Sequence, residues 1–435
     1  MFRYYLDLAL LSLRKNKVLT ALMIVAIALG IGASMTTLTV LRILAGDPLP
    51  EISDTLFAPQ LDVGGKIDYR PDNEPADQLT RLDAEALLRA KRADRQALMT
   101  GGDVAVNPER DSLRPFNTGA RYTSADFFAM FNVPFAFGRS WQEAEDRSSA
   151  RVAVISKELN DKLFSGVDSV GKGLEINGTE FRIVGVLEHW RPSPRFYDLS
   201  SGNYANAEQV YLPFSTSRQL DLPRSGNMNC FDDRPPEMKD TDVGAPCTWI
   251  QFWVQLDSRD KADAYMAFLR NYSDEQRAAG RYERPTNVRL RSLMQWLDYK
   301  NVVPDDAKLQ TYLAFGFLVV CLINTVGLLL AKFLRRAPEI GVRRALGASR
   351  RAVFAQFLVE AGLIGIAGGA LGLGLAWLGL WAVRQQPTDY AALIHLDLPM
   401  LLTTFALALV ASLAAGLLPA FRACQITPAM QLKSQ

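Results

Sequence analysis

Residues 18–41 read VLTALMIVAIALGIGASMTTLTVL and carry no charged side chain. The hydrocarbon core of a bilayer is ~30 Å thick, so a helix needs about 20 mostly apolar residues to cross it. A core helix of a soluble protein rarely stays uncharged over such a length. This stretch therefore predicts a first transmembrane helix, which we expect at residues 18–45.

Three further stretches of the 435-residue chain have the same character. Residues 309–331 and 398–421 carry no charge, and Glu360 is the only charged residue in 352–383. The overall hydrophobic fraction of 49% conceals this concentration, because the rest of the chain is polar. The sequence predicts a membrane α-helical protein with four transmembrane helices, at 18–45, 307–331, 351–383 and 398–421.

Residues 1–17 precede the first membrane segment and mix charged with apolar side chains near helical spacing. This pattern is typical of a helix that lies in the cytoplasmic membrane interface. The alternative is that these residues extend the first membrane helix. The first apolar stretch is too long for a signal peptide and lacks a clean cleavage site, so we expect it to be retained.

Basic residues in short loops predict the orientation, because they collect on the cytoplasmic side. Residues 332–350 form the most basic short loop, whereas 384–397 carries only Arg384 as a basic residue. We therefore place the N-terminus, the 332–350 loop and the tail at 422–435 in the cytoplasm. Residues 46–306 then form a large extracytoplasmic domain.

The extracytoplasmic segment alternates strand-like and helix-like stretches, which predicts an α+β domain. Asn177-Gly178 between two apolar runs is a strong signal for a two-residue hairpin turn. Ser258 is a plausible N-cap for a long helix that stops at Gly280. We expect strands at 151–156, 181–187, 209–213 and 249–256, and helices at 82–99, 124–131, 157–164 and 258–279.

Cys230 and Cys247 both fall in the extracytoplasmic segment. An oxidising compartment favours a disulfide between them, and the chain between them has no core pattern of its own. Closing a loop of this size contributes about 3 kcal/mol in the chain-entropy model. The alternative is two unrelated thiols; we expect the disulfide.

The sequence offers no catalytic constellation and no metal site. Residues 166–173, GVDSVGKG, satisfy the start of a phosphate-loop motif, but Gly173 stands where Ser or Thr is needed to reach Mg²⁺. Four cysteines and two histidines leave little material for zinc. The acidic pair Asp232-Asp233 is read as a solvated loop rather than a calcium site. A formal net charge of +2 gives no reason to expect nucleic acid.

Residues 324–347, NTVGLLLAKFLRRAPEIGVRRALG, resemble the signature of the FtsX/MacB superfamily of ABC transporter permeases. A basic loop follows an apolar helix and leads into a glycine-rich one. Several outer stretches resemble the MacB-like periplasmic core domain, and the tail RACQITPAMQL resembles the family's C-terminal end. The outer stretches are TSADFFAMFNVPFAFGRSW at 123–141, RVAVISKELNDKLF at 151–164, GVDSVGKGLEINGTEFRIVGV at 166–186 and QVYLPFS at 209–215.

The resemblance implies a permease subunit in the bacterial inner membrane that works as a dimer, with a second copy or a paralogue. It implies mechanotransmission: ATP and Mg²⁺ bind a partner ABC ATPase, and this non-catalytic chain, which binds no cofactor, moves its periplasmic domain. The chain begins almost at the membrane, so we expect the ATPase on a separate polypeptide. The expected task is efflux of a peptide, antibiotic or other amphiphile, with a periplasmic adaptor and outer-membrane duct; the alternatives are lipoprotein release and a signalling permease that regulates a cell-wall hydrolase.

The cytoplasmic loop also predicts a short helix on local grounds alone. Pro338 suits a first helical turn, Gly347 a left-handed stop and Ser349 the N-cap of the next helix. The family resemblance implies that this helix docks on the ATPase; the alternative is that its arginines only set topology and contact anionic lipid. The residues expected to couple to the ATPase are Glu339, Ile340, Gly341, Arg343, Arg344, Leu346 and Gly347.

The third apolar stretch carries glycines at small-residue spacing, which allows close helix packing in lipid. The sequence does not decide between packing within the chain and a dimer contact. Glu360 is costly if it faces lipid, so we expect it to pair with an arginine of the cytoplasmic loop, such as Arg350 or Arg351; the alternative is a proton-relay role. The glycines expected to pack are Gly365, Gly368, Gly369, Gly372 and Gly374.

Overall fold

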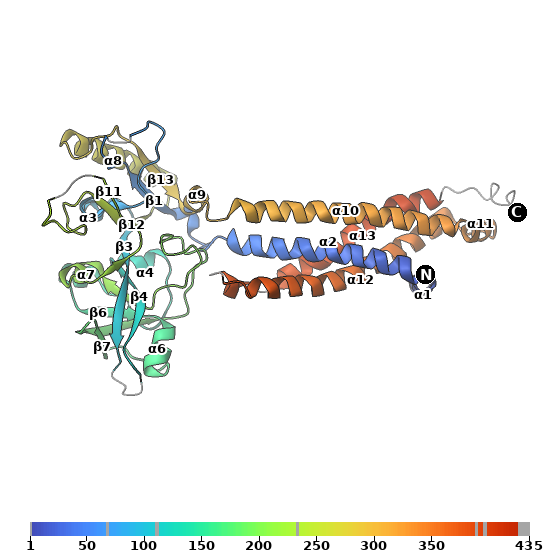
Figure 1. Ribbon diagram of the computed structural model, residues 1–435, viewed down its shortest axis with the longest axis horizontal. Helices are drawn as coiled ribbons and strands as arrows, with labels where there is room; N and C mark the ends of the chain where they lie inside the picture. Colours follow the sequence, from blue (N-terminus) through green and yellow to red (C-terminus); the bar gives the residue numbers. More distant parts are fainter. Residues whose placement is uncertain are drawn as a thin grey trace. The chain divides into compact units, whose positions relative to one another are not determined.

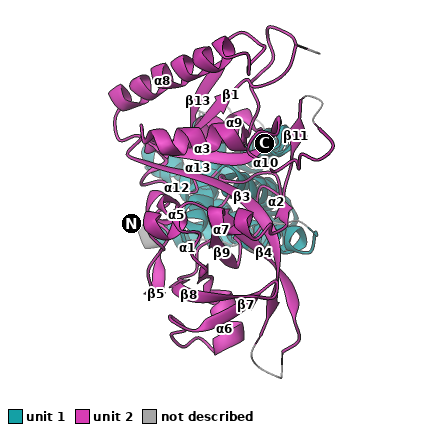
Figure 2. Cartoon of the chain, turned by 90° about the vertical axis from the view of Figure 1, so that its left-hand side faces the viewer, with its two compact units in different colours: residues 1–45, 303–435 teal, residues 46–302 magenta. Residues whose placement is uncertain are grey.

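The computed structural model divides the chain into two compact units (Figure 2). The helical unit comprises residues 1–45 and 303–435, and the inserted unit comprises residues 46–302. The structure describes residues 2–66, 69–108, 113–231, 235–387, 390–394 and 398–424. The expected acidic pair Asp232-Asp233 and most of the C-terminal tail lie outside these residues.

Four helices of the helical unit are long and apolar enough to cross a membrane, counted over the described part of the chain. Helices α2 and α12 pack along each other, α10 packs on α2, and α13 packs on α12 and α10 (Figure 1). The unit contains α1 (Phe2–Lys15), α2 (Lys17–Leu44), α10 (Asp305–Arg335), α11 (Ala337–Ala345), α12 (Arg350–Arg384), the short 3-10 helix η2 (Ala391–Leu393) and α13 (Leu398–Cys424).

A break at Asn16 separates the N-terminal helix α1 from α2. The backbone of Asn16 leaves the helical region, with φ −121° and ψ 59°. Helix α1 is therefore a distinct element that contacts α12 rather than a straight extension of α2. Its position at the membrane interface stays a prediction.

The inserted unit is built on one mixed sheet of thirteen strands, counted over the described residues, with helices on its faces (Figure 1). The main strand order is β13-β1-β12-β3-β4-β9-β6-β8-β5. Its strands are β1 (Leu56–Leu61), β2 (Leu79–Thr80), β3 (Arg95–Asn107), β4 (Phe116–Thr123), β5 (Phe135–Gly138), β6 (Val152–Ile155), β7 (Gly173–Ile176), β8 (Thr179–Leu187), β9 (Val210–Pro213), β10 (Arg224–Ser225), β11 (Asn229–Cys230), β12 (Cys247–Gln255) and β13 (Val288–Ser292). Its helices are η1 (Ser53–Thr55), α3 (Arg81–Ala90), α4 (Asp126–Met130), α5 (Glu143–Arg147), α6 (Lys157–Phe164), α7 (Phe214–Gln219), α8 (Arg259–Ala278) and α9 (Leu293–Tyr299).

The long strand β3 joins the two halves of this sheet. Its first residues, 95–99, pair with β12, and residues 99–106 pair with β4. Because one continuous strand serves both partners, the two halves share one sheet.

Most of the predicted elements of the inserted unit are confirmed. All four expected strands are present, and Asn177 and Gly178 both have positive φ in the hairpin between β7 and β8. The Ser258 side chain caps α8 by accepting from the backbone of Lys261.

The helix predicted for residues 82–99 is wrong in its second half. Helix α3 ends at Ala90, Lys91 takes a left-handed conformation, and residues 95–99 belong to β3. Backbone pairing with the central strand β12 overrides the helical composition of this stretch.

A buried set of charges lies inside the inserted unit, which we name the Arg121 cluster: Arg121, Arg195, Asp198 and Glu208. The Arg121 guanidinium bonds Asp198 at 2.7 Å and also contacts Glu208. Arg195 reaches Glu208 at 3.2 Å, and the hydroxyl of Tyr197 donates to Glu208 at 2.8 Å. Although burial opposes it, Arg121 and Arg195 hold the pKa of Asp198 below its usual value. The cluster fastens the irregular segment 195–208 to β4.

Candidate functional site

Helix α11 begins and ends as its local sequence predicts. Pro338 lies in its first turn, and Gly347 follows its end with a φ of +102°. The Ser349 hydroxyl accepts a hydrogen bond from the backbone of Ala352 and so caps α12. One residue, Arg336, separates α11 from α10, so any movement of α11 acts directly on a membrane helix.

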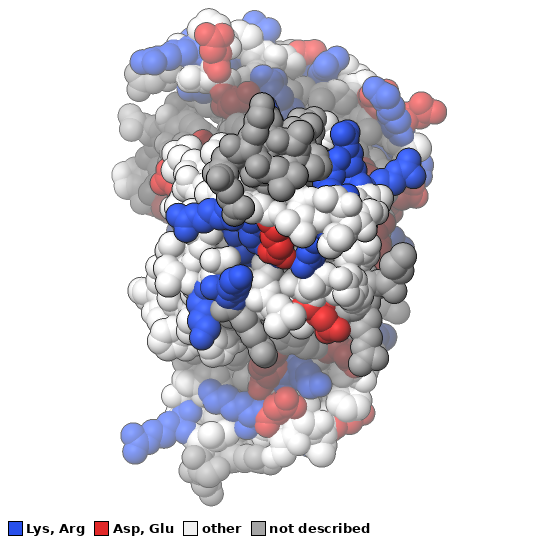
Figure 3. Space-filling view, turned by 90° about the vertical axis from the view of Figure 1, so that its right-hand side faces the viewer, with Lys and Arg blue, Asp and Glu red and all other residues white. Residues whose placement is uncertain are grey.

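The two sides of α11 differ in exposure. Ile340 and Gly341 are buried within the helical unit. Val342 is 60% exposed and Leu346 is 83% exposed, four residues apart, so they share one helix face. We name Val342, Ala345 and Leu346 the outer face of α11. The end of the helical unit that faces the viewer in Figure 3 also exposes Lys and Arg side chains around fewer Asp and Glu.

A buried cluster of charged and polar side chains lies next to the N-terminal end of α11. We name it the Glu360 cluster, and it consists of Ser12, Lys332, Arg336 and Glu360. The Glu360 carboxylate accepts from the Ser12 hydroxyl at 2.7 Å and pairs with Arg336 at 3.3 Å. Lys332 contacts the same carboxylate, and both side chains are fully buried. These four residues come from α1, α10, the α10–α11 junction and α12, so the cluster ties three helices together.

Glu339 connects α11 to this cluster. Its carboxylate lies 3.2 Å from Arg336 and 2.7 Å from Arg343. The hydrogen bond from Arg336 holds the pKa of Glu339 below its usual value, so the carboxylate is ionised at neutral pH. Arg343 in turn donates to Gln356 of α12 at 3.2 Å. Glu339 and Arg343 therefore hold the inner side of α11 against the membrane helices.

The expected pairing of Glu360 with an arginine of the cytoplasmic loop is confirmed, but the partner is Arg336 rather than Arg350 or Arg351. Helix α12 is continuous from Arg350 to Arg384, so Glu360 lies roughly 15 Å along the axis from Arg350. The end of α10 and the following Arg336 lie alongside instead and supply both cations. Lys332, Arg336 and Ser12 are functional candidates that the sequence did not single out, and the same holds for Val342.

The glycines of α12 divide between two neighbouring helices. A Cβ on Gly368 would meet Ile27 of α2 at 2.8 Å, and one on Gly372 would meet Ile31 at 3.2 Å. Gly365 and Gly369 face α13 in the same way, at Ser412 and Ala408. Gly374 differs, because no described atom lies within 4 Å of its added Cβ. Four of the five expected glycines thus lie against helices of the same chain.

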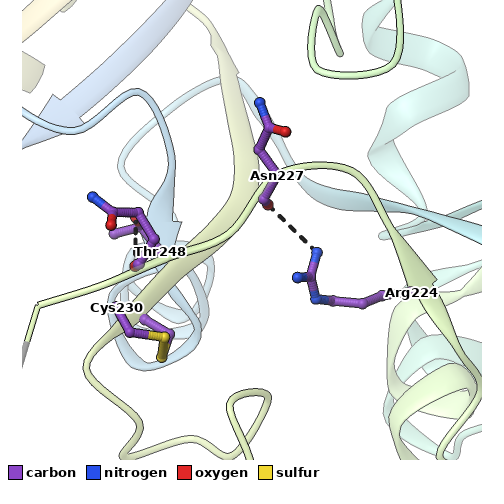
Figure 4. Close-up of a disulfide and its surroundings, with 6 residues drawn as sticks. Arg224, Asn227, Cys230 and Thr248 are labelled. Carbon is purple, nitrogen blue, oxygen red and sulfur yellow. Dashed lines mark hydrogen bonds between the residues drawn. A yellow bond between two sulfur atoms is a disulfide. The ribbon is translucent and has the colours of Figure 1, made fainter. Parts of the chain in front are cut away.

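The Cys230–Cys247 disulfide is confirmed (Figure 4). The two residues face each other in the antiparallel pair of β11 and β12. On one side of the bridge the Thr248 hydroxyl donates to the carbonyl of Asn229, and Arg224 donates to the carbonyl of Asn227. The Asp240 carboxylate lies close to both sulfurs, but sulfurs joined to each other offer no thiolate to a metal.

Comparison with known proteins decides the family. Residues 20–272, more than half of the chain, match the family model of the MacB-like periplasmic core domain. Residues 312–428 match that of the FtsX-like permease C-terminal region. The chain belongs to the MacB-like ABC transporter permeases. This MacB-like permease is a multi-pass protein of the bacterial inner membrane, with a large periplasmic α+β domain and, among the described residues, four helices long and apolar enough to span the membrane.

Curated relatives include the pyoverdine export ATP-binding/permease protein PvdT of two Pseudomonas species. The protein of Pseudomonas syringae pv. tomato is 25% identical over 360 residues, which cover 75% of this chain and 47% of the relative. That of Pseudomonas entomophila is 26% identical over 375 residues, which cover 83% of this chain and 49% of the relative. The MacB-like permease therefore spans about half the length of the curated relatives it matches.

Two solved structures are also similar. The periplasmic region of MacB from Actinobacillus actinomycetemcomitans is 13% identical with a TM-score of 0.37, and the match covers 59% of this chain and 98% of that one. The extracellular domain of the Gram-positive ABC-type transporter YknZ is 13% identical with a TM-score of 0.34, and the match covers 54% and 99%.

Proposed function

We propose that this permease couples ATP hydrolysis by a separate ABC ATPase to movement of its periplasmic unit, with α11 as the docking helix. The observation that supports this proposal most strongly is that the two sides of α11 differ. Its inner side is fixed to α10 and α12 through Glu339, Arg343 and the Glu360 cluster. Its outer face presents Val342 and Leu346, which are apolar and exposed. An exposed apolar pair on a rigidly held helix suits docking into a groove of a partner.

The chain offers a continuous route from α11 to the periplasmic unit. Helix α11 follows α10 after one residue, and α10 connects directly to the periplasmic unit at residues 302–303. Helix α2, the other connection, packs along α10. A push on α11 would therefore reach both chain connections of the periplasmic unit.

In this mechanism ATP and Mg²⁺ belong to the partner, and the permease performs no chemistry of its own. Its mobile part is the periplasmic unit, and two permease copies, or this chain and a paralogue, would work together. The relatives are named for pyoverdine export, which supports efflux as the task. The proposed cargo is a peptide, antibiotic or other amphiphile, handed to a periplasmic adaptor and an outer-membrane duct.

The docking proposal is tested by purifying the tagged permease from its host and identifying the proteins that accompany it. We expect an ABC ATPase, which Leu346→Asp or Val342→Asp should remove, because a carboxylate on the outer face would lose its solvation in the groove. Val167→Asp is the matched control: Val167 is also exposed, at 56%, but lies in the periplasmic unit. Glu339→Lys and Gly341→Trp should also release the ATPase, since they disturb the inner side.

Each alternative has its own outcome. If the ATPase stays with the Val342 and Leu346 variants, the arginines act on topology and lipid and docking lies elsewhere. An accompanying adaptor and duct would support efflux, whereas an accompanying cell-wall hydrolase would support a signalling permease. If no ATPase appears even after crosslinking, the coupling proposal fails.

A further inference from the structure

The periplasmic unit contains a cavity of about 100 Å³ that none of the coupling contacts uses. It lies between β12, the segment 196–200 and helix α9. A single water needs only ~10–15 Å³ of such space, so the cavity can hold a larger group. Its walls combine aromatic rings with three amide side chains, of which only Gln251 is buried. The rings are Phe196, Tyr197, Phe252, Trp253 and Trp296, and the other two amides are Gln78 and Asn227.

The aromatic walls are fixed by contacts with each other and with the Arg121 cluster. The Trp253 ring meets Phe196 edge-on at 5.2 Å and Trp296 edge-on at 6.4 Å. Asp198, also in the wall, is held by Arg121 at 2.7 Å. The cavity is therefore preformed, which lowers the entropic cost of binding.

Two polar groups in the wall are buried without a partner. Gln251 is 9% exposed and its Oε1 atom has no hydrogen-bond partner in the described part of the chain. The same is true of the indole Nε1 of Trp296, which is 8% exposed. A buried polar group without a partner costs ~1–3 kcal/mol, so a ligand that satisfies both groups would gain from them. An indole N–H can only donate, whereas a side-chain amide can both donate and accept.

We propose that this cavity binds a compact, neutral, amide-bearing aromatic or apolar group. An amide carbonyl would accept from the Trp296 indole, and an amide N–H would donate to the Gln251 carbonyl. The ring or apolar part would lie against Phe196 and Trp253. The charged groups in the wall already have partners, Asp198 with Arg121 and Asp77 with Lys300, so the cavity presents no free charge to an ionic ligand.

The proposal goes beyond the coupling mechanism and does not depend on it, because the permease alone should bind. The test uses the full chain purified in detergent and three probes of one shape, with binding followed by saturation-transfer NMR. Benzamide carries both hydrogen-bonding functions, acetophenone keeps only the carbonyl, and benzoate carries a charge. We expect benzamide to bind about tenfold more tightly than acetophenone and benzoate to bind weakest, since each loses at least one buried hydrogen bond.

Variants separate this site from general hydrophobic binding. Gln251→Met and Trp296→Phe should each weaken benzamide binding about tenfold. The matched control is Trp249→Phe, because the Trp249 indole nitrogen is likewise buried without a described partner but Trp249 does not line the cavity. Unchanged benzamide affinity in both cavity variants would overturn the proposal. Equal affinity for benzamide and acetophenone would also overturn it, and so would the absence of any binding, which would leave a cavity that holds only water.

Discussion

The Glu360 cluster of the helical unit and the Arg121 cluster of the periplasmic unit bury charge in different ways. The Arg121 cluster balances two arginines with two carboxylates, and all four side chains are buried. The Glu360 cluster sets one buried carboxylate against Lys332 and Arg336, and Arg336 continues outward to Glu339. The Arg121 cluster is therefore wholly buried, whereas the Glu360 cluster is connected to the protein surface through Arg336 and Glu339.

This difference fits different tasks. A closed, balanced set of charges holds a fixed geometry, because breaking any pair leaves an uncompensated buried ion. A cluster that continues to the surface through Arg336 can respond to a partner there. The Arg121 cluster thus gives the periplasmic unit a rigid core. The Glu360 cluster of the helical unit instead lies where a movement of α11 can alter its ion pairs. Four predictions test this comparison.

The largest effect is expected from Arg121→Leu, which leaves Asp198 and Glu208 facing each other in the core. Removing one partner of a buried ion pair typically costs ~3–5 kcal/mol. Thermal unfolding of the purified permease should show a large loss of stability in the periplasmic unit. Arg139→Leu is the control, because its pair with Glu145 has a side chain 55% exposed and should change stability by less than about 1 kcal/mol. Similar effects of the two substitutions would show that the cluster is not a structural core.

A smaller loss is expected from Glu360→Gln, because Arg336 is partly exposed and keeps its pair with Glu339. We expect ~2–4 kcal/mol, together with weaker ATPase stimulation in the assembled transporter. The double variant Glu360→Gln with Lys332→Met removes both buried partners and should recover most of the stability. If the double variant regains stability but not ATPase stimulation, the ion pair acts in coupling. If it regains both stability and ATPase stimulation, the ion pair serves only folding.

The sequence predicts local features of the coupling site well and its distant contacts poorly. Pro338, Gly347 and Ser349 act on the backbone within a few residues, so the limits of α11 could be predicted. Ser12 lies 348 positions from Glu360 in the sequence, and no local pattern joins them. The sequence correctly predicted a loop arginine beside Glu360, but it could not identify Arg336 as that arginine.

The same distinction holds in the periplasmic unit. The hairpin at Asn177-Gly178 and the cap at Ser258 depend on neighbouring residues and were predicted correctly. The strand at 95–99 depends on pairing with β12, about 150 residues later in the chain. Its local composition favours a helix, so the predicted helix extended wrongly into this strand. The partners of Arg121, 77 and 87 positions away, left no local signal either.

The stability of the periplasmic unit should depend on pH through Asp146, with an effect smaller than that of the two charge clusters. Burial raises the pKa of Asp146 to about 7, although hydrogen bonds from the backbone of Ala125 and the indole of Trp141 lower it. Between pH 4 and 7 the folded state then binds more protons than the unfolded state, so stability falls as pH rises through this window. Because Asp146 is only partly buried, we expect a loss of ~2 kcal/mol rather than the full value of the pKa change.

Asp146→Asn should remove this slope, so the unfolding temperatures of wild type and variant should approach each other at low pH. At pH 7 the variant should be the more stable protein. Asp161→Asn, at an exposed position, is the control and should leave the slope unchanged. A wild-type slope that survives in the Asp146 variant would assign the titration to another group.

The smallest effect separates two glycines of α12, six residues apart. Gly368→Ala places a methyl 2.8 Å from Ile27 of α2, and such overpacking typically costs ~1–3 kcal/mol. Gly374→Ala meets no described atom within 4 Å and should instead gain up to about 1 kcal/mol from helix propensity. Thermal unfolding of the two variants should therefore change in opposite directions. If both variants lose stability, a surface outside this chain, such as a second permease copy, also packs against Gly374, and the helical unit would be held at α12 from two sides.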